Sequence, residues 1–124
     1  IICVEVPNDF NMLQEIVYSK INNNWWICED HINYFNVKSI NNLLIKAGLN
    51  LIHTKVTFPM EFFILMGDNY ISTPELGKKS HLRRVNFEKN LTFYNKELKE
   101  RLYNCFLELG IGQEIITYGR KKNE

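Results

Sequence analysis

The sequence lacks a long apolar run, a signal peptide and a disulfide pattern. No stretch approaches the roughly 20 apolar residues that span a bilayer, and the first residues have neither a basic flank nor a cleavage site. The three cysteines are scattered in an odd-numbered set that is unlike a disulfide framework: Cys3, Cys28 and Cys105. We therefore expect a soluble cytoplasmic protein with reduced thiols and no membrane partner.

The chain also lacks a charge excess of either sign. Fifteen Lys and Arg side chains against 14 Asp and Glu give a net charge of +1, which produces no strong field toward nucleic acid. A basic sheet surface with interleaved aromatic residues is missing too, so we expect no nucleic-acid partner. The 124 residues, 45% of them hydrophobic, are enough for the core of one small globular domain.

The first residues form a nearly continuous apolar run. Ile1–Val6 is rich in β-branched residues, a pattern typical of a strand buried on both faces of a parallel sheet. An unpaired apolar edge invites association, so such a strand needs neighbours on both sides. Because no Met precedes Ile1, we expect sequence upstream of it, and self-association of the 124-residue chain through this first-strand edge.

Helical spacing and caps recur along the chain. Asn36 is a good N-cap, Gly48 and Gly110 are good helix ends, and Thr73-Pro74 can start a helix. Residues 25–31 have no clear period and are interpreted as a partly buried loop. The predicted helices cover residues 11–21, 36–47, 60–66, 74–91 and 96–109.

Two further strands are predicted, over residues 51–58 and 114–118. The first is closed by Pro59, and Arg120–Glu124 follows the second as a solvated tail. Helices separate the strand at residues 1–6 from the strand at residues 51–58, which indicates an α/β fold in which these two strands run parallel.

Six short blocks, taken in order, resemble a known family. They are residues 4–9 (VEVPND), 30–35 (DHINYF), 46–49 (KAGL), 57–61 (TFPME), 65–68 (LMGD) and 110–114 (GIGQE). Together they look like the C-terminal portion of a class I, Rossmann-like S-adenosylmethionine-dependent methyltransferase, and the resemblance covers essentially the whole chain.

The resemblance implies a mixed sheet in which residues 1–6 are the fifth strand and residues 51–58 the sixth. Residues 114–118 would be the seventh strand, inserted antiparallel, and residues 59–109 a helical insertion before it. The implied activity is methyl transfer from S-adenosylmethionine to a small-molecule or sugar-like substrate.

The family's Gly-rich turn after the first strand and the acidic residue after the second are missing from this chain. Gly110-Ile111-Gly112 follows a helix and precedes a strand, which is the reverse of the order that cradles a nucleotide. We therefore expect S-adenosylmethionine to be bound mainly by residues absent from this chain. The fragment alone is expected to be inactive.

Candidate site residues follow from the predicted strand ends. Asn8 and Asp9 lie beyond the carboxyl end of the first strand, where open α/β sheets bind ligands, although turn chemistry selects the same residues. Two further substrate-binding candidates are Tyr34 and Glu61, the latter an acid within an apolar run. A position at a helix N-terminus would account for the acid at position 61 equally well. His31 is the candidate catalytic base, because an imidazole accepts a proton near neutral pH; its alternative is a hydrogen-bonded loop anchor.

Other polar and aromatic clusters have simpler explanations. Cys28 and His31 have the spacing of two metal ligands, but no second pair completes a site, so we expect no metal. Trp25 and Trp26 fit loop anchoring better than stacking on a substrate. The basic stretch can contact an anionic substrate or form a solvated helix face in which Arg84 pairs with Glu88; its members are Lys78, Lys79, His81, Arg83 and Arg84.

A second function stays open. The same α/β chain fits a non-catalytic binding or protein-interaction domain that holds its partner with the helices between the last two strands.

Overall fold

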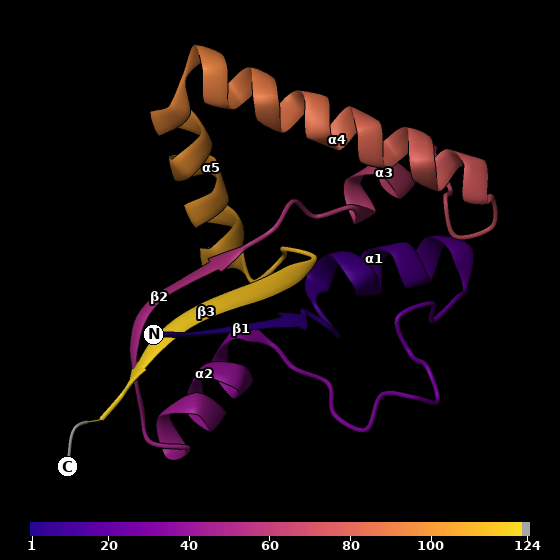
Figure 1. Ribbon diagram of the computed structural model, residues 1–124. Coiled ribbons are helices and arrows are strands. Elements are labelled where there is room, and N and C mark those ends of the chain that lie inside the picture. Colours follow the sequence, from indigo (N-terminus) through magenta and orange to yellow (C-terminus); the bar gives the residue numbers. More distant parts are fainter. Residues whose placement is uncertain (123–124) are drawn as a thin grey trace.

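The computed structural model describes residues 1–122, which form a three-stranded sheet and five helices (Figure 1). No helix in this part of the chain combines the length and apolarity needed to cross a bilayer. In chain order the elements are β1 (Ile2–Pro7), α1 (Met12–Ile21), α2 (Val37–Lys46), β2 (Leu49–Val56), α3 (Glu61–Leu65), α4 (Pro74–Tyr94), α5 (Lys96–Leu109) and β3 (Glu114–Lys121).

The last strand lies in the middle of the sheet. The strand order is β1-β3-β2, and β3 runs antiparallel to both of its neighbours. The arrows of β1 and β2 therefore point the same way in Figure 1, while the arrow of β3 points the opposite way. The predicted α/β class and the antiparallel last strand are confirmed. The two predicted parallel strands share a direction, but each pairs with β3 instead of with the other.

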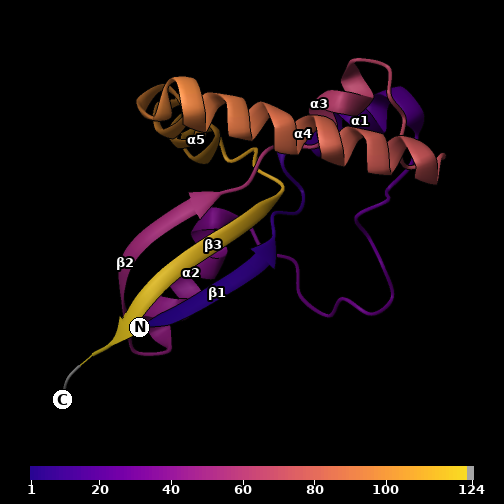
Figure 2. The ribbon, with the colours of Figure 1, turned by 45° about the horizontal axis from the view of Figure 1, so that its top comes forward.

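The predicted burial of the first strand on both faces is wrong for the described residues. Ile2 and Glu5 are exposed, whereas Val4 and Val6 are partly buried and pack against the core. The buried face of the sheet is the one that α2 covers. Figure 2 shows α2 behind the sheet. One edge of β1 pairs with β3, and the other edge has no strand partner within residues 1–122.

The predicted helix starts at Asn36 and at residue 11 are confirmed, and both are reciprocally capped. The Asn11 side chain accepts hydrogen bonds from the main-chain N–H groups of Leu13 and Gln14, and the side-chain oxygen of Gln14 accepts one from the main-chain N–H of Asn11. Asn36 and Ser39 make the same exchange at α2. These bonds satisfy donors that have no partner inside the helix.

Several element ends differ from the prediction, and α4 continues to Tyr94, three residues further than expected. β2 begins and ends two residues earlier, and β3 continues to Lys121, so Arg120 and Lys121 are strand residues because they pair with the start of β2. The last two residues of the predicted tail lie outside the described residues. Thr73 precedes α4, but its side chain makes no capping hydrogen bond. Gly48 and Gly110 adopt the positive φ angles expected at helix ends, 88° and 69°.

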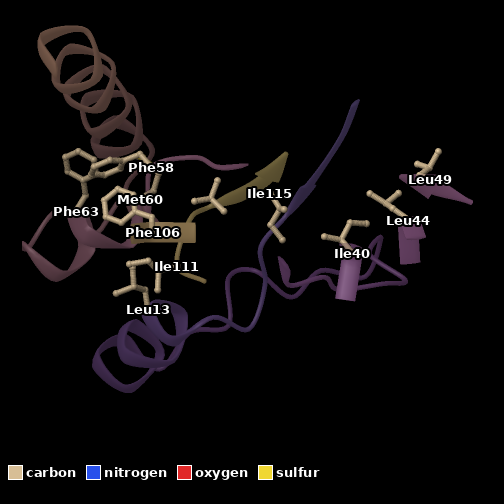
Figure 3. Packing of buried hydrophobic residues seen from close by; sticks show 11 residues of the cluster. Leu13, Ile40, Leu44, Leu49, Phe58, Met60, Phe63, Phe106, Ile111 and Ile115 are labelled. Atoms are coloured by element: carbon tan, nitrogen blue, oxygen red, sulfur yellow. The ribbon is translucent and has the colours of Figure 1, made fainter. Parts of the chain in front are cut away.

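The core has two parts that meet at the central strand (Figure 3). Aromatic side chains form the first part, where Phe58 contacts Phe63 and Phe106 with ring centroids 5.8 and 6.2 Å apart. Ile40 and Leu44 of α2 form the second part beneath the sheet, together with Leu49. Ile115 of β3 is fully buried between the two parts, so the central strand joins them.

Candidate functional site

The chain leaves β1 and β2 at the same edge of the sheet, and buried polar residues gather there. Asn8 and Asp9 follow β1, while Glu61 begins α3, five residues after β2 ends. All three are buried although their side chains are polar or ionisable. The carboxyl ends of parallel strands are the usual ligand-binding edge of an α/β sheet.

Asn8 connects the end of β1 to the segment before β3 by hydrogen bonds. Its side-chain nitrogen donates to the main-chain carbonyls of Gly110 and Gly112, at 2.8 and 2.7 Å, and its main-chain N–H donates to Gln113. Both side-chain N–H groups are thus used within the protein. The buried Oδ1 atom has no hydrogen-bond partner among the described residues. The predicted substrate-binding residue Asn8 therefore has a structural task at the start of the last strand.

Asp9 lies beside the first turn of α1. Its carboxylate accepts a 3.4 Å hydrogen bond from Nε2 of Gln14, and its main-chain N–H donates to Phe35. Burial raises the pKa of Asp9, while the Gln14 hydrogen bond and the charge of His31 act in the opposite direction. The charge of His31, 22 positions further along the sequence, therefore acts on the Asp9 carboxyl.

Glu61 is the most deeply buried acid of the edge, with 2% of its surface exposed. Burial raises its pKa to about 7; a hydrogen bond from its own main-chain N–H lowers it, and the charge of Asp9 raises it further. The Oε2 atom has no hydrogen-bond partner within the described part of the chain. Tyr70 lies close enough that the charge of Glu61 adds to burial in raising the pKa of its phenol. Glu61 therefore has an unused acceptor atom, and burial places its pKa near neutral pH.

The loop between α1 and α2 carries the other two predicted residues. Tyr34 uses its hydroxyl to bond both the N–H and the carbonyl of Cys28, each at 3.2 Å, and its ring meets Phe10 edge-on at 5.4 Å. His31 is exposed, and its ring lies 6.0 Å from the Tyr34 ring. Tyr34 thus holds the loop in shape, whereas His31 is exposed and near enough to Asp9 to affect it.

The two tryptophans serve the same loop. Trp26 makes edge-on contacts with Trp25, Phe10 and Tyr18, at centroid distances of 4.8, 5.8 and 6.4 Å. These contacts agree with the loop-anchoring interpretation.

Two members of the edge were missed by the sequence analysis. Gln14 had a usable signal, because it stands three residues after the N-cap Asn11 and so had to lie beside that cap. Tyr70 had none, since it follows α3 in an irregular segment and reaches Glu61 only through the fold.

Two of the five residues of the basic stretch of α4 form ion pairs within the described chain. Arg83 pairs with Asp68 and also lies over the Phe63 ring, 5.0 Å from its centroid. Arg84 pairs with Glu88 at 2.9 Å, as predicted. Arg83 therefore contacts α3 and the segment after it, whereas the Arg84 pair lies within α4.

Residues 1–122 contain no cluster of three or more His, Cys, Asp or Glu side chains suited to a metal ion. Comparison of the chain with protein-family models, with curated proteins and with solved structures gives no match.

Proposed function

We propose that this chain supplies the acceptor-binding part of an S-adenosylmethionine-dependent methyltransferase. The observation that supports it most is the sheet arrangement, with β3 inserted antiparallel between two mutually parallel strands. The sequence resemblance implies the same arrangement for the last three strands of that family. Polar residues also gather at the shared carboxyl edge, which is the usual ligand-binding edge of an α/β sheet.

In this proposal, Glu61 and Asp9 recognise a hydroxyl or amine of a small-molecule or sugar-like acceptor. The Oε2 atom of Glu61, which has no partner among the described residues, accepts a hydrogen bond from the hydroxyl or amine of the methyl-accepting molecule. With a pKa of about 7, Glu61 then takes the proton of that group. His31 is the second candidate base, because it is exposed and lies close to Asp9. Asn8 and Tyr34 act by holding the edge and the loop in place.

The described residues do not fit S-adenosylmethionine. Among the glycines, Gly112 has the closest neighbour to the position of a Cβ atom. A Cβ atom there would lie 2.2 Å from Cβ of Val56. The space is therefore needed by the protein's own β2 strand and not by a cofactor. When bound elsewhere, S-adenosylmethionine supplies the methyl group; the residues of this chain bind and orient the acceptor.

Calorimetric titration with S-adenosylhomocysteine tests the proposal. The 124-residue chain should not bind it, whereas a longer natural polypeptide carrying residues before Ile1 should bind it. In that longer protein, Glu61→Gln should keep binding but reduce transfer of a labelled methyl group to small molecules from a cell extract. Absence of binding in both proteins would refute the methyltransferase proposal.

A protein-interaction domain is the second candidate, and one observation favours it. Phe93 and Tyr94, at the corner between α4 and α5, are 82% and 80% exposed. Large exposed aromatic side chains often mark binding surfaces. Under this function, Phe93→Ser with Tyr94→Ser would abolish capture of a protein partner, while Glu61→Gln would not affect it.

A further inference from the structure

A groove of about 640 Å³ lies between strand β2 and helix α5, on the sheet face opposite α2. The face is identified by Thr54, which points to α2 and bonds Asn41, whereas its neighbours Lys55 and His53 point the other way into the groove. None of the groove residues belongs to the Asp9–Glu61 edge.

The groove has more positive than negative side chains. The basic side chains come from strand β2 and from helix α5. The two acidic side chains, Glu88 and Glu100, come from helices α4 and α5. Glu88 is already neutralised by Arg84 at 2.9 Å, and Glu100 makes only a long, solvent-exposed contact with Lys96, at 3.8 Å. Such an exposed pair contributes little. The basic side chains are His53, Lys55, Lys96 and Lys99.

Lys55 and Lys99 have no carboxylate partner within residues 1–122. Nζ of Lys55 lies 5.5 Å from the centroid of the Tyr118 ring. Nζ of Lys99 donates to Oγ1 of Thr92 at 2.9 Å and lies 5.8 Å from the Tyr103 ring. Their positive charges therefore remain available to an anion.

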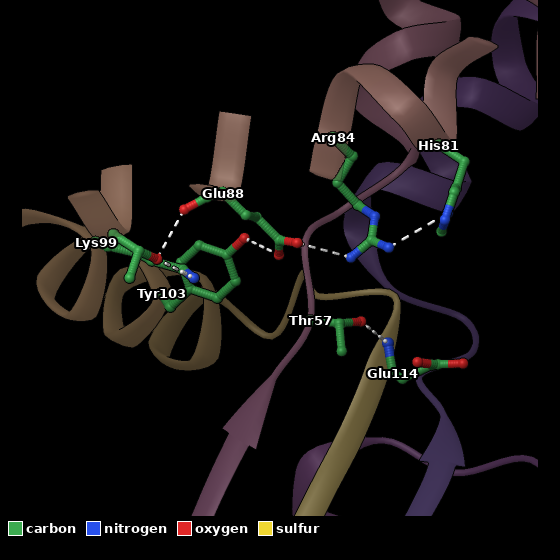
Figure 4. Close-up of polar contacts among 8 residues, drawn as sticks. Thr57, His81, Arg84, Glu88, Lys99, Tyr103 and Glu114 are labelled. Atoms are coloured by element: carbon green, nitrogen blue, oxygen red, sulfur yellow. Dashed lines mark hydrogen bonds and ion pairs between the residues drawn. The ribbon is translucent and has the colours of Figure 1, made fainter. Parts of the chain in front are cut away.

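The helical wall is held by a hydrogen-bonded network (Figure 4). Glu88 of α4 lies between Arg84 of the same helix and the hydroxyl of Tyr103 of α5. The Tyr103 hydroxyl is thereby used, while Tyr103 also lines the groove together with the apolar residue Ile116. The groove thus combines free ammonium groups with an aromatic and apolar wall.

We propose that this groove binds a small phosphorylated organic molecule, with its phosphate between Lys55 and Lys99 and its organic part against Tyr103. Lysine ammonium groups bind phosphate as point charges, and two of them reach the groove from different elements. This site is independent of the proposed methyl transfer, because it uses none of the residues assigned to the acceptor.

A titration of the ¹⁵N-labelled chain with glucose 1-phosphate, followed by NMR, tests the site. We expect saturable shifts at Lys55, Thr57 and Lys99, and at least tenfold weaker binding by Lys55→Gln with Lys99→Gln. The control pair Lys38→Gln with Lys46→Gln makes the same charge change on α2 and should keep the affinity. Thermal unfolding of both pairs verifies that each is folded.

Glucose and inorganic phosphate are the two reference probes. Glucose should cause no shifts, and inorganic phosphate should bind more weakly than glucose 1-phosphate because it lacks a part that contacts Tyr103. Equal weakening by the two lysine pairs, equal affinity for inorganic phosphate, or shifts outside the groove would overturn the proposal.

Discussion

Asn8 and Gly112 join the end of the first strand to the beginning of the last. The side-chain nitrogen of Asn8 donates to the Gly112 carbonyl at 2.7 Å across 104 positions of sequence, and also to Gly110 at 2.8 Å. The bond is buried, so its loss leaves a polar carbonyl without water or a protein partner.

Replacing Asn8 with alanine should therefore destabilise the protein strongly. One buried and one partly buried carbonyl lose their donor, and we expect the free energy of unfolding to fall by about 2–4 kcal/mol. Urea unfolding followed by circular dichroism measures the change. Asn33→Ala, at an exposed loop position, is the control and should stay within about 0.5 kcal/mol of the parent. Similar losses in both variants would contradict the structural role of Asn8.

Two glycines should respond to alanine in opposite directions. A Cβ atom at Gly112 would lie 2.2 Å from Cβ of Val56, so Gly112→Ala should cost about 1–3 kcal/mol or more. At Gly77, inside α4, the nearest atom would be at 3.9 Å, and Gly77→Ala should stabilise by up to about 1 kcal/mol through helix propensity. Thermal melts of the two variants provide the comparison, and a tolerated alanine at 112 would refute the close approach.

Glu61 should make stability depend on pH. Its pKa is about 7 in the folded protein and 4.5 ordinarily, so the folded state holds the proton more tightly. Glu61 therefore does not reduce the free energy of unfolding below about pH 4.5. Its destabilising effect grows as the pH rises toward 7 and is complete above that pH. The penalty is roughly 3 kcal/mol. Glu61→Gln should remove this slope and be the more stable protein at pH 8.

Urea unfolding at pH 5 and pH 8 measures the effect of Glu61→Gln. The exposed loop substitution Glu29→Gln is the matched control and should leave the pH dependence unchanged. Parallel pH profiles of the parent and Glu61→Gln would argue against a buried, shifted carboxyl.

Tyr103 should stabilise the corner between α4 and α5 through its hydroxyl. Tyr103→Phe keeps the ring but removes the hydrogen bond to Glu88, and we expect a loss of about 1 kcal/mol. Tyr94→Phe removes a hydroxyl that has no hydrogen bond among the described residues, and it should have little effect. A second Tyr103→Phe measurement on a Glu88→Gln background should show a smaller loss, because the interaction is already weakened.

Within residues 1–122 one edge of β1 has no strand partner, and this edge should cause the 124-residue chain to associate. Light scattering should give a mass above that of the 14.8 kDa monomer, increasing with concentration. Ile2→Lys places a charge on this strand and should reduce association, whereas Ile32→Lys, in the exposed loop, should not. A stable monomer at all concentrations would contradict the prediction.

The sequence by itself determined the local features of this protein. Asn36 and Gly110 mark helix ends because their side-chain and backbone preferences act within a few residues, and Arg84 meets Glu88 because they are one helical turn apart. The α/β class followed from the same local patterns. The antiparallel last strand was expected only from the family resemblance.

Tertiary structure alone decided which distant residues meet. Hydrophobic pattern suggested that both faces of β1 are buried, but burial depends on the elements that cover each face, and the described chain covers only one. No sequence period predicts the effect of the Asp9 charge on Glu61 or the hydrogen bond from Tyr103 to Glu88. Separate elements of the fold bring these side chains near one another. The proton affinity of Glu61 follows from that packing, since burial and a neighbouring charge are properties of the folded chain.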